Sequence, residues 1–191
     1  MLKVSVIVAT HKRPDLISRC LDTLAPGMQT TPSADYEVIV VDDDINRSAT
    51  PVLQEKYRWV KVVYGPSIGP GGARNTGAAF AQAPYLIFVD DDCIPTPHLI
   101  EAFMKKARPG LVQLGQTTCK DGIRNPFDHA PENPKGEEWF SCNFSMEREA
   151  FHRLGGFDEG FLKYGFEDYD FFRRCKDNAL TIAPNIEASV D

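Results

Sequence analysis

The sequence lacks the features that mark several large classes of protein. Its five cysteines are scattered and form no CxxC pair, so we expect reduced thiols and neither a disulfide framework nor a zinc site. No apolar run approaches the roughly 20 residues of a membrane-spanning helix. Acidic residues outnumber basic ones by 27 to 21, which disfavours nucleic acid as a partner. These absences favour a cytoplasmic chain with no transmembrane segment, and they leave peripheral contact with the inner face of a membrane open.

Activated nucleophiles and paired histidines are also missing. The four histidines are isolated and show no HExxH-type spacing, so we expect them to be non-catalytic. Ser145 and Cys142 lack the nucleophile-elbow context of a hydrolase. What remains is a chain of 191 residues, 42% hydrophobic and 25% charged, which suits one globular domain with a buried core.

Short apolar runs alternate with helical patterns along the first half. The patterns predict strands over residues 4–9, 37–41, 60–64 and 85–89, and helices over 15–24, 50–57 and 73–81. This alternation predicts an α/β fold with a mostly parallel central sheet flanked by helices, in which ligands bind at the carboxyl ends of the strands. In the second half the patterns predict helices over 97–106, 147–154 and 168–176, a strand over 111–114, and a mobile loop over 117–136.

Three consecutive acids, Asp90, Asp91 and Asp92, follow the fourth predicted strand. Alternate residues at a strand end can point the same way, so Asp90 and Asp92 can offer a pair of hard oxygens to Mg²⁺ or Mn²⁺. Such an ion can neutralise a diphosphate. The alternative is an acidic, solvated turn, and the apolar strand directly before the acids favours the metal.

Polar groups also follow other predicted strands. Thr10 comes after the first strand and Asp42 after the second, where a carboxylate can accept hydrogen bonds from a base or a ribose; a turn or helix-cap acid is the alternative. Residues 69–77 combine glycines with Arg74 before a predicted helix, a pattern typical of a phosphate-binding turn. The alternative is a flexible loop with a surface arginine.

Glu167 and Asp168 open the last predicted helix. A carboxylate there can take a proton from a hydroxyl, or it can simply be stabilised by the helix dipole. The surrounding aromatic residues can form an apolar wall, a sugar-stacking platform or plain core; they are Phe157, Phe161, Tyr164, Phe166 and Tyr169.

Six motifs, in this order, resemble family 2 glycosyltransferases of the GT-A fold. They are VSVIVAT (4–10), EVIVVDD (37–43), GARNTG (72–77), FVDDD (88–92), NFSM (143–146) with GGFDE (155–159), and the ED pair (167–168) followed by Phe171, Arg173 and Arg174. The resemblance covers nearly the whole chain. It implies an inverting, metal-assisted transfer from a nucleotide-diphospho-sugar, with a UDP-sugar favoured, to a saccharide, lipid-linked or other hydroxyl acceptor.

The resemblance also implies a role for each matched position. Residues 1–95 would form a nucleotide-sugar-binding half and residues 96–191 an acceptor-binding half within one domain, 1–191. Asp168 matches the general base, with Glu167 beside it as acceptor ligand or alternative base, and Asp90 and Asp92 match the metal site. The nucleotide-sugar site would comprise Thr10, Arg13, Asp42, Gly72, Arg74, Asn75, Asp90 and Asp91.

The chain departs from the family pattern in three places. Asp44-Ile45 stands where Gly-Ser is frequent, and the loop 117–136 matches no assigned segment. No metal-binding His follows Pro184, so Asp191 substitutes for it, the ligand is absent or the chain is truncated. A nucleotidyltransferase is disfavoured, because residues 11–14 after the first strand are not glycine-rich. A nucleotide-sugar-binding module without catalysis of its own stays an alternative, and a homodimer stays open.

Overall fold

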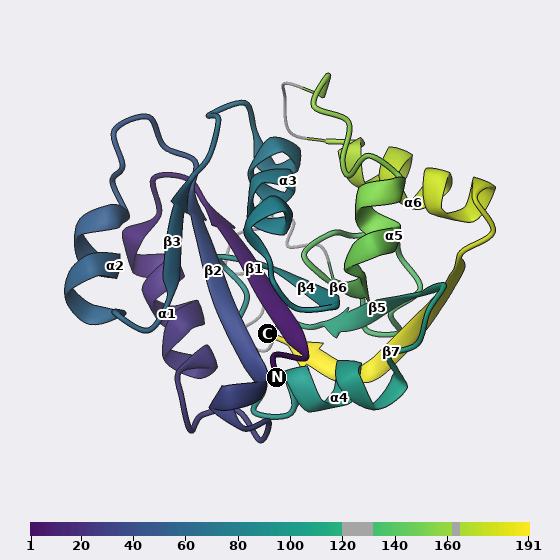
Figure 1. The fold of residues 1–191 in the computed structure, drawn as a ribbon, viewed down its shortest axis with the longest axis horizontal. Helices are drawn as coiled ribbons and strands as arrows, with labels where there is room; N and C mark the ends of the chain where they lie inside the picture. The colour runs from purple at the N-terminus through teal and green to yellow at the C-terminus, as the bar shows by residue number, and fades with distance from the viewer. Residues whose placement is uncertain (120–131, 162–164) are drawn as a thin grey trace.

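The computed structural model describes residues 1–119, 132–161 and 165–191. Their strands form one sheet in the order β3-β2-β1-β4-β6-β5-β7, flanked by helices (Figure 1). The strands are β1 (Val4–Thr10), β2 (Tyr36–Asp42), β3 (Lys61–Tyr64), β4 (Tyr85–Asp90), β5 (Leu111–Thr117), β6 (Asn143–Glu147) and β7 (Thr181–Val190). The helices are α1 (Pro14–Leu24), the 3₁₀ turn η1 (Ser33–Asp35), α2 (Thr50–Lys56), α3 (Pro70–Phe80), α4 (Leu99–Lys106), α5 (Arg148–Arg153) and α6 (Glu167–Asp177).

Strands β1 to β4 are mutually parallel, as the sequence predicts. They are Val- and Ile-rich because both faces of the sheet are covered. Helices α1, α2 and α4 pack on one face and α3, α5 and α6 on the other. In the register, Thr10 lies opposite Asp42, and Ala9 lies opposite Asp90. The carboxyl ends of β1, β2 and β4 therefore meet at one edge of the sheet.

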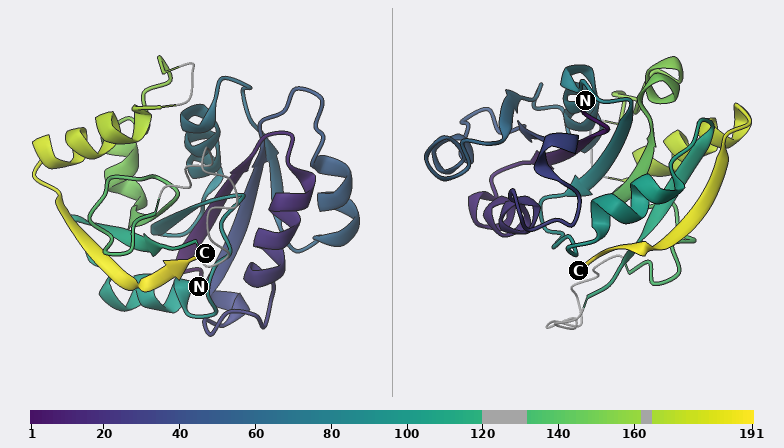
Figure 2. Two further views of the ribbon diagram at one scale, coloured as in Figure 1. Left: turned by 180° about the vertical axis from the view of Figure 1, so that it is seen from behind. Right: turned by 60° about the horizontal axis from the view of Figure 1, so that its bottom comes forward.

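The second half completes the sheet with mixed pairing. Strand β6 runs antiparallel to both β4 and β5, and β7 runs parallel to β5. Four of the six strand pairings in the described sheet are thus parallel, which confirms the mostly parallel prediction. Figure 2 shows β7, in yellow, running along the edge of the sheet beside β5 and α4.

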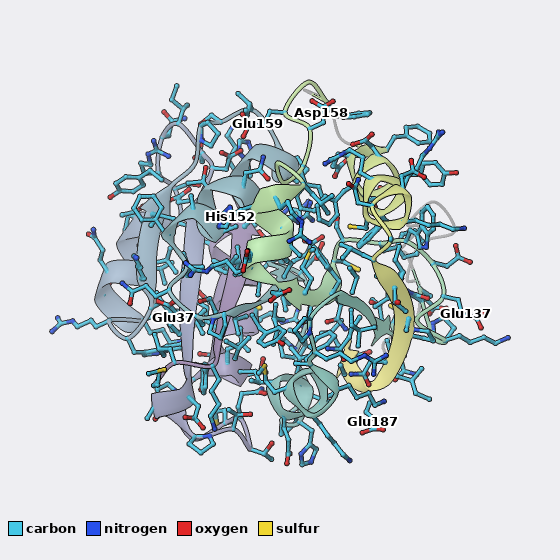
Figure 3. All side chains as sticks on the ribbon, turned by 45° about the vertical axis from the view of Figure 1, so that its right-hand side comes forward. Glu37, Glu137, His152, Asp158, Glu159 and Glu187 are labelled. Atoms are coloured by element: carbon cyan, nitrogen blue, oxygen red, sulfur yellow. The ribbon has the colours of Figure 1, made fainter. Side chains whose placement is uncertain are left out.

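The sequence patterns do not predict strands β6 and β7, and in each case there is a physical reason for the omission. Polar Asn143 and Ser145 interrupt the apolar pattern of β6, although both side chains are buried. Strand β7 contains Pro184 and carries Glu187 at the molecular surface (Figure 3). Proline is tolerated there because β7 is an edge strand, where an N–H need not bond to a neighbouring strand.

Part of the predicted mobile loop proves to be ordered structure. Strand β5 continues to Thr117, and the backbone N–H and carbonyl of Asn133 pair with Thr117. Residues 120–131 of that prediction lie outside the described residues. Among the described residues, none of the helices has both the length and the apolar character needed to cross a membrane.

Candidate active site

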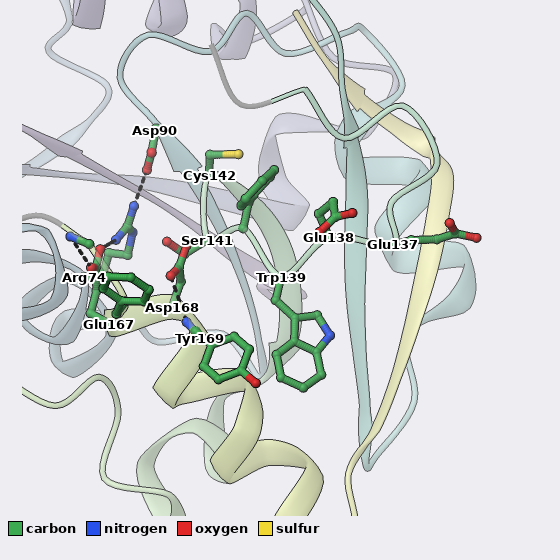
Figure 4. A pocket seen from close by; sticks show the side chains of 13 residues that line it. Arg74, Asp90, Glu137, Glu138, Trp139, Ser141, Cys142, Glu167, Asp168 and Tyr169 are labelled. Atoms are coloured by element: carbon green, nitrogen blue, oxygen red, sulfur yellow. Dashed lines mark hydrogen bonds and ion pairs between the residues drawn. The ribbon is translucent and has the colours of Figure 1, made fainter. Parts of the chain in front are cut away.

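Two adjoining pockets open at the carboxyl edge of the parallel strands. The β1 pocket has a volume of about 270 Å³ and is lined by Ala9, Thr10, His11, Arg13, Asp43, Ser67, Gly69, Pro70, Arg74, Asp90 and Asp91. The α6 pocket has a volume of about 560 Å³ and is lined by Arg74, Asp90, Glu137, Glu138, Trp139, Phe140, Ser141, Cys142, Gly165, Phe166, Glu167, Asp168 and Tyr169 (Figure 4). Arg74 and Asp90 line both pockets, so this pair is their shared wall.

Arg74 projects from the first turns of α3 and is buried. Its Nη2 donates to Asp90 Oδ1 at 2.6 Å, and its Nη1 lies 3.7 Å from Glu167 Oε1. Burial works against the charged guanidinium, but attraction to Asp90 and Glu167 outweighs it, so the pKa of Arg74 is raised and the side chain stays charged. Nη1 is buried and has no hydrogen-bond partner. Arg74 therefore places a buried, charged guanidinium in the wall between the two cavities.

The three acids at the end of β4 contact different neighbours. Asp90 faces Arg74, whereas buried Asp91 accepts hydrogen bonds from Thr10 Oγ1 at 2.7 Å and from Arg13 Nη1 at 3.1 Å. Burial raises the pKa of Asp91 to about 6, although Thr10 and Arg13 oppose the shift. Asp92 is half-exposed and shares Arg13 Nη1 at 3.1 Å. Burial, together with repulsion from Asp90, raises the pKa of Asp92.

The start of α6 presents the two remaining acids differently. Gly165 and Phe166 both have positive φ, 119° and 70°, and this left-handed turn leads directly into the helix. Glu167 is buried, accepts from the Gly165 N–H at 3.0 Å and faces Arg74. Asp168 is partly exposed and accepts from the Tyr169 N–H at 2.8 Å. Both acids line the α6 pocket, and Asp168 is the more exposed of the two (Figure 4).

The comparison with known families decides the classification. The model of glycosyl transferase family 2 matches residues 5–169. The chain belongs to glycosyl transferase family 2.

Similar proteins support this membership. Validoxylamine A glucosyltransferase of Streptomyces hygroscopicus subsp. limoneus is 28% identical over 233 residues, covering 97% of this chain and 50% of that protein. Poly(ribitol-phosphate) beta-glucosyltransferase of Bacillus spizizenii is 40% identical over 96 residues, covering 48% of this chain and 15% of that protein. This family 2 chain thus spans about half the length, or less, of these relatives.

Solved structures show the same fold. The crystal structure of S. aureus TarS 1-349 in complex with UDP matches with a TM-score of 0.77 at 23% identity, covering 99% of this chain and 59% of that one. The complex of the same fragment with UDP-GlcNAc gives 0.77 at 22% identity, with 99% and 57% covered. The GT-A architecture expected of this family 2 chain is confirmed.

Four of the predicted site residues line neither pocket: Asp42, Gly72, Asn75 and Asp92. Asp42 is fully buried, and its Oδ2 accepts from the N–H of Thr50 at 3.0 Å and from its hydroxyl at 2.8 Å. These contacts hold the start of α2. This is the structural role expected of Asp42 if it is a turn or helix-cap acid.

Asp43, which the sequence reasoning passed over, borders the β1 pocket instead. Its carboxylate accepts from the Ser67 N–H at 2.7 Å and from the Gly69 N–H at 3.3 Å. Burial raises the pKa of Asp43 despite these hydrogen bonds. The alternation of side chains at the end of β2 could have separated Asp42 from Asp43.

Gly72 and Asn75 hold loops that lie next to α3. A Cβ at Gly72 would lie 2.6 Å from Ile68 Cγ1, so only glycine lets the 66–69 loop pack this closely on α3. Asn75 donates to the Phe157 carbonyl at 2.9 Å and accepts from its N–H at 2.8 Å, and it donates to Glu159 at 3.0 Å. Its side chain thereby ties α3 to the 157–159 segment.

The aromatic residues divide between core and wall. Phe157 is core: it is 2% exposed and stacks on Phe171 with ring centroids 4.5 Å apart. Phe166 and Tyr169 line the α6 pocket, Phe161 lines neither pocket, and Tyr164 lies outside the described residues. Sequence reasoning also missed Trp139, because residues 137–142 carry no periodic pattern.

Proposed function

We propose that this chain transfers a sugar from a UDP-sugar in the β1 pocket to a hydroxyl of an acceptor in the α6 pocket. The observation that carries the proposal is the shared wall of Arg74 and Asp90, which joins the two cavities. A reacting sugar at this junction would have the guanidinium of Arg74 on one side and the Asp168 carboxylate on the other. The UDP and UDP-GlcNAc complexes of TarS support the choice of donor.

The reaction that fits these groups is a single displacement. Asp168 takes the proton of the acceptor hydroxyl while that oxygen bonds to the anomeric carbon. The bond from this carbon to the diphosphate oxygen breaks, its electron pair leaves with UDP, and the anomeric centre is inverted. The charged guanidinium of Arg74, which lines the β1 pocket, is suited to stabilise the departing diphosphate, because it is a preorganised cation in a buried site. Buried Glu167 holds Arg74 in place.

Asp92, with Asp90 beside it, would hold a divalent cation, Mn²⁺ or Mg²⁺. The hard carboxylate oxygens suit such an ion, and the pKa of Asp92 is raised by burial and by repulsion from Asp90, a repulsion that a cation would relieve. Within the described ranges no three His, Cys, Asp or Glu side chains are arranged around a metal position, so diphosphate oxygens and water would complete the coordination. The bound ion would neutralise charge on the diphosphate.

Catalysis is tested with Asp168→Asn, which keeps the shape of the side chain but cannot accept the proton. We expect kcat for UDP release from UDP-glucose or UDP-GlcNAc with an acceptor to fall about 10²–10⁴-fold. UDP affinity measured by calorimetry should stay the same, because Asp168 does not line the β1 pocket. Glu167→Gln is the matched variant. Loss of turnover in Glu167→Gln alone would move the base to Glu167, and UDP binding without any turnover would favour a binding module.

The metal proposal is tested with Asp92→Ala. The rise in melting temperature that UDP produces with Mn²⁺ should lose its Mn²⁺-dependent part, whereas the melting temperature without ligand should change little because Asp92 is half-exposed. Glu55→Ala, an exposed acid on α2, is the control. A full Mn²⁺-dependent rise in Asp92→Ala would exclude Asp92 as a ligand.

A further inference from the structure

Arg13, the residue directly before α1, bridges two of the acids at the end of β4. Its Nη1 donates to Asp91 Oδ1 and to Asp92 Oδ2, both at 3.1 Å, so one nitrogen serves two carboxylates. Asp91 is buried, and its other oxygen accepts from Thr10 Oγ1 at 2.7 Å. Both oxygens of Asp91 are therefore engaged by side chains of the first strand and the turn after it, and this carboxylate anchors Arg13.

The contact of Arg13 with Asp92 is of a different kind. The side chains of Arg13 and Asp92 are 51% and 52% exposed, whereas that of Asp91 is 5% exposed. Exposed ion pairs contribute little free energy, so the pair with Asp92 can open at small cost while the pair with Asp91 stays closed. The bridge thus has one fixed end and one labile end.

Asp92 is also the carboxylate that would hold a divalent cation, together with Asp90. An arginine already neutralises each of them, because Asp90 Oδ1 accepts from Arg74 and Asp92 Oδ2 accepts from Arg13. A doubly charged ion at this position would be repelled by both guanidinium groups. Arg74 is buried and fixed, so the exposed Arg13 is the one of these two that can move away from the metal position.

The β1 pocket gives Arg13 somewhere to turn, since Arg13 and Asp91 both line it. A diphosphate in that pocket would offer anionic oxygens, which a guanidinium binds through strong, charge-assisted hydrogen bonds. Such a ligand could take over the Nη1 that Asp92 gives up, while Asp91 still anchors the side chain.

We propose that Arg13 is the resident counter-ion of Asp92 and couples metal binding to nucleotide binding. This inference rests on the donor and metal sites of the proposed function. Without nucleotide, Arg13 opposes the binding of a divalent cation at Asp92. With UDP bound, Arg13 pairs with the diphosphate and leaves Asp92 available. Because coupling between two ligands is reciprocal, UDP affinity should rise by the same factor when the cation is present.

The test measures Mn²⁺ binding to the whole chain with and without UDP, from the electron paramagnetic resonance signal of free Mn²⁺. A titration of UDP without protein corrects for Mn²⁺ held by the nucleotide in solution. Arg13→Gln removes the charge and keeps much of the length of the side chain. Without UDP, we expect Mn²⁺ to bind Arg13→Gln about tenfold more tightly than the wild-type chain, and the gain in Mn²⁺ affinity that UDP produces should shrink about tenfold. An unchanged or weaker Mn²⁺ affinity in Arg13→Gln would overturn the inference.

Three further variants locate the effect. Arg13→Lys keeps a positive charge and should bind Mn²⁺ within about twofold of wild type; a tenfold gain here would exclude charge as the cause. Arg19→Gln removes an exposed arginine of α1 and is the matched control, with little change expected. Adding Asp92→Ala to Arg13→Gln should abolish the gain, because the carboxylate that Arg13 releases is gone. A gain that persists in the double variant would place the Mn²⁺ elsewhere and refute the assignment.

Ligand binding by the wild-type chain separates this inference from the proposed function. Absence of UDP binding contradicts the proposed function. Binding of UDP without binding of Mn²⁺ contradicts the metal site and this inference with it. Binding of both ligands, with a Mn²⁺ affinity that does not depend on Arg13, contradicts only this inference.

Discussion

The two halves of the sheet are built in different ways. In β1 to β4 the buried strand residues are mostly valine, isoleucine, leucine and phenylalanine, and polar groups gather at the strand ends. In β5 to β7 polar side chains lie inside the sheet. Asn185 donates to the Ala102 carbonyl and to Gln113 Oε1, both at 2.9 Å, and Gln113 donates to the Phe103 carbonyl at 3.0 Å. The first half is held mainly by apolar packing, whereas the second combines an apolar core with buried side-chain hydrogen bonds.

This difference extends to the two pockets. The β1 pocket takes its polar groups from strand ends whose positions follow from the parallel register. The α6 pocket takes its wall from Trp139, in an irregular segment, and from a left-handed turn before α6. Specific side-chain contacts therefore determine the α6 pocket more than periodicity does. A substitution in the second half should act more locally and be harder to foresee.

The largest effect is expected where the two halves meet. Arg74→Ala leaves Asp90 and Glu167 without their shared cation, and breaking such a buried pair costs about 3–5 kcal/mol of unfolding free energy. Urea unfolding measures this. UDP affinity should fall while that of uridine changes little, if Arg74 contacts only phosphate. A loss of unfolding free energy below about 1 kcal/mol, or equal losses of affinity for both ligands, would contradict this role.

A smaller loss of stability is expected from a substitution that distinguishes the two halves of the sheet. Asn185→Ala leaves the buried Gln113 amide oxygen and the Ala102 carbonyl without their donor, so we expect a loss of about 2–3 kcal/mol in unfolding free energy. Val8→Ala in β1 is the matched apolar truncation, and it should leave the β5–β7 region protected in hydrogen exchange. If Asn185→Ala does not selectively expose the amides of β5 and β7, the buried amide network is not what holds this half together.

The smallest effect distinguishes neighbouring acids in the first half. Asp42→Asn removes a charged acceptor from Thr50 and should lower the unfolding free energy by about 1–2 kcal/mol with little change in UDP affinity. Asp43→Asn should instead weaken UDP binding, because Asp43 lines the β1 pocket. Urea unfolding and calorimetry on both variants decide the point. The opposite pattern would return the nucleotide role to Asp42.

The sequence predicts the first half well because burial on both faces leaves a strong apolar signal in each strand. It also brings Thr10, Arg13, Arg74, Asp90 and Asp91 to one pocket. Asp42, which faces inward, was not separated from Asp43, although the side-chain alternation at the end of β2 could have done so. Strand β6 was missed because two of its buried residues, Asn143 and Ser145, are polar and interrupt the apolar pattern. The wall residue Trp139 was missed because no local pattern surrounds it.

Strand β7 also bears on how the chain associates. Residues 94–96 pair with its C-terminal end, so the rest of this ten-residue edge strand is where another chain could add. Pro184 removes one of these donors, and Glu187, paired with Lys105 at 3.8 Å and Lys106 at 3.2 Å, places a cluster of charges beside the strand. These features oppose sheet-to-sheet addition along the middle of β7. The middle of β7 is therefore a poor template for strand addition by a second copy of this chain.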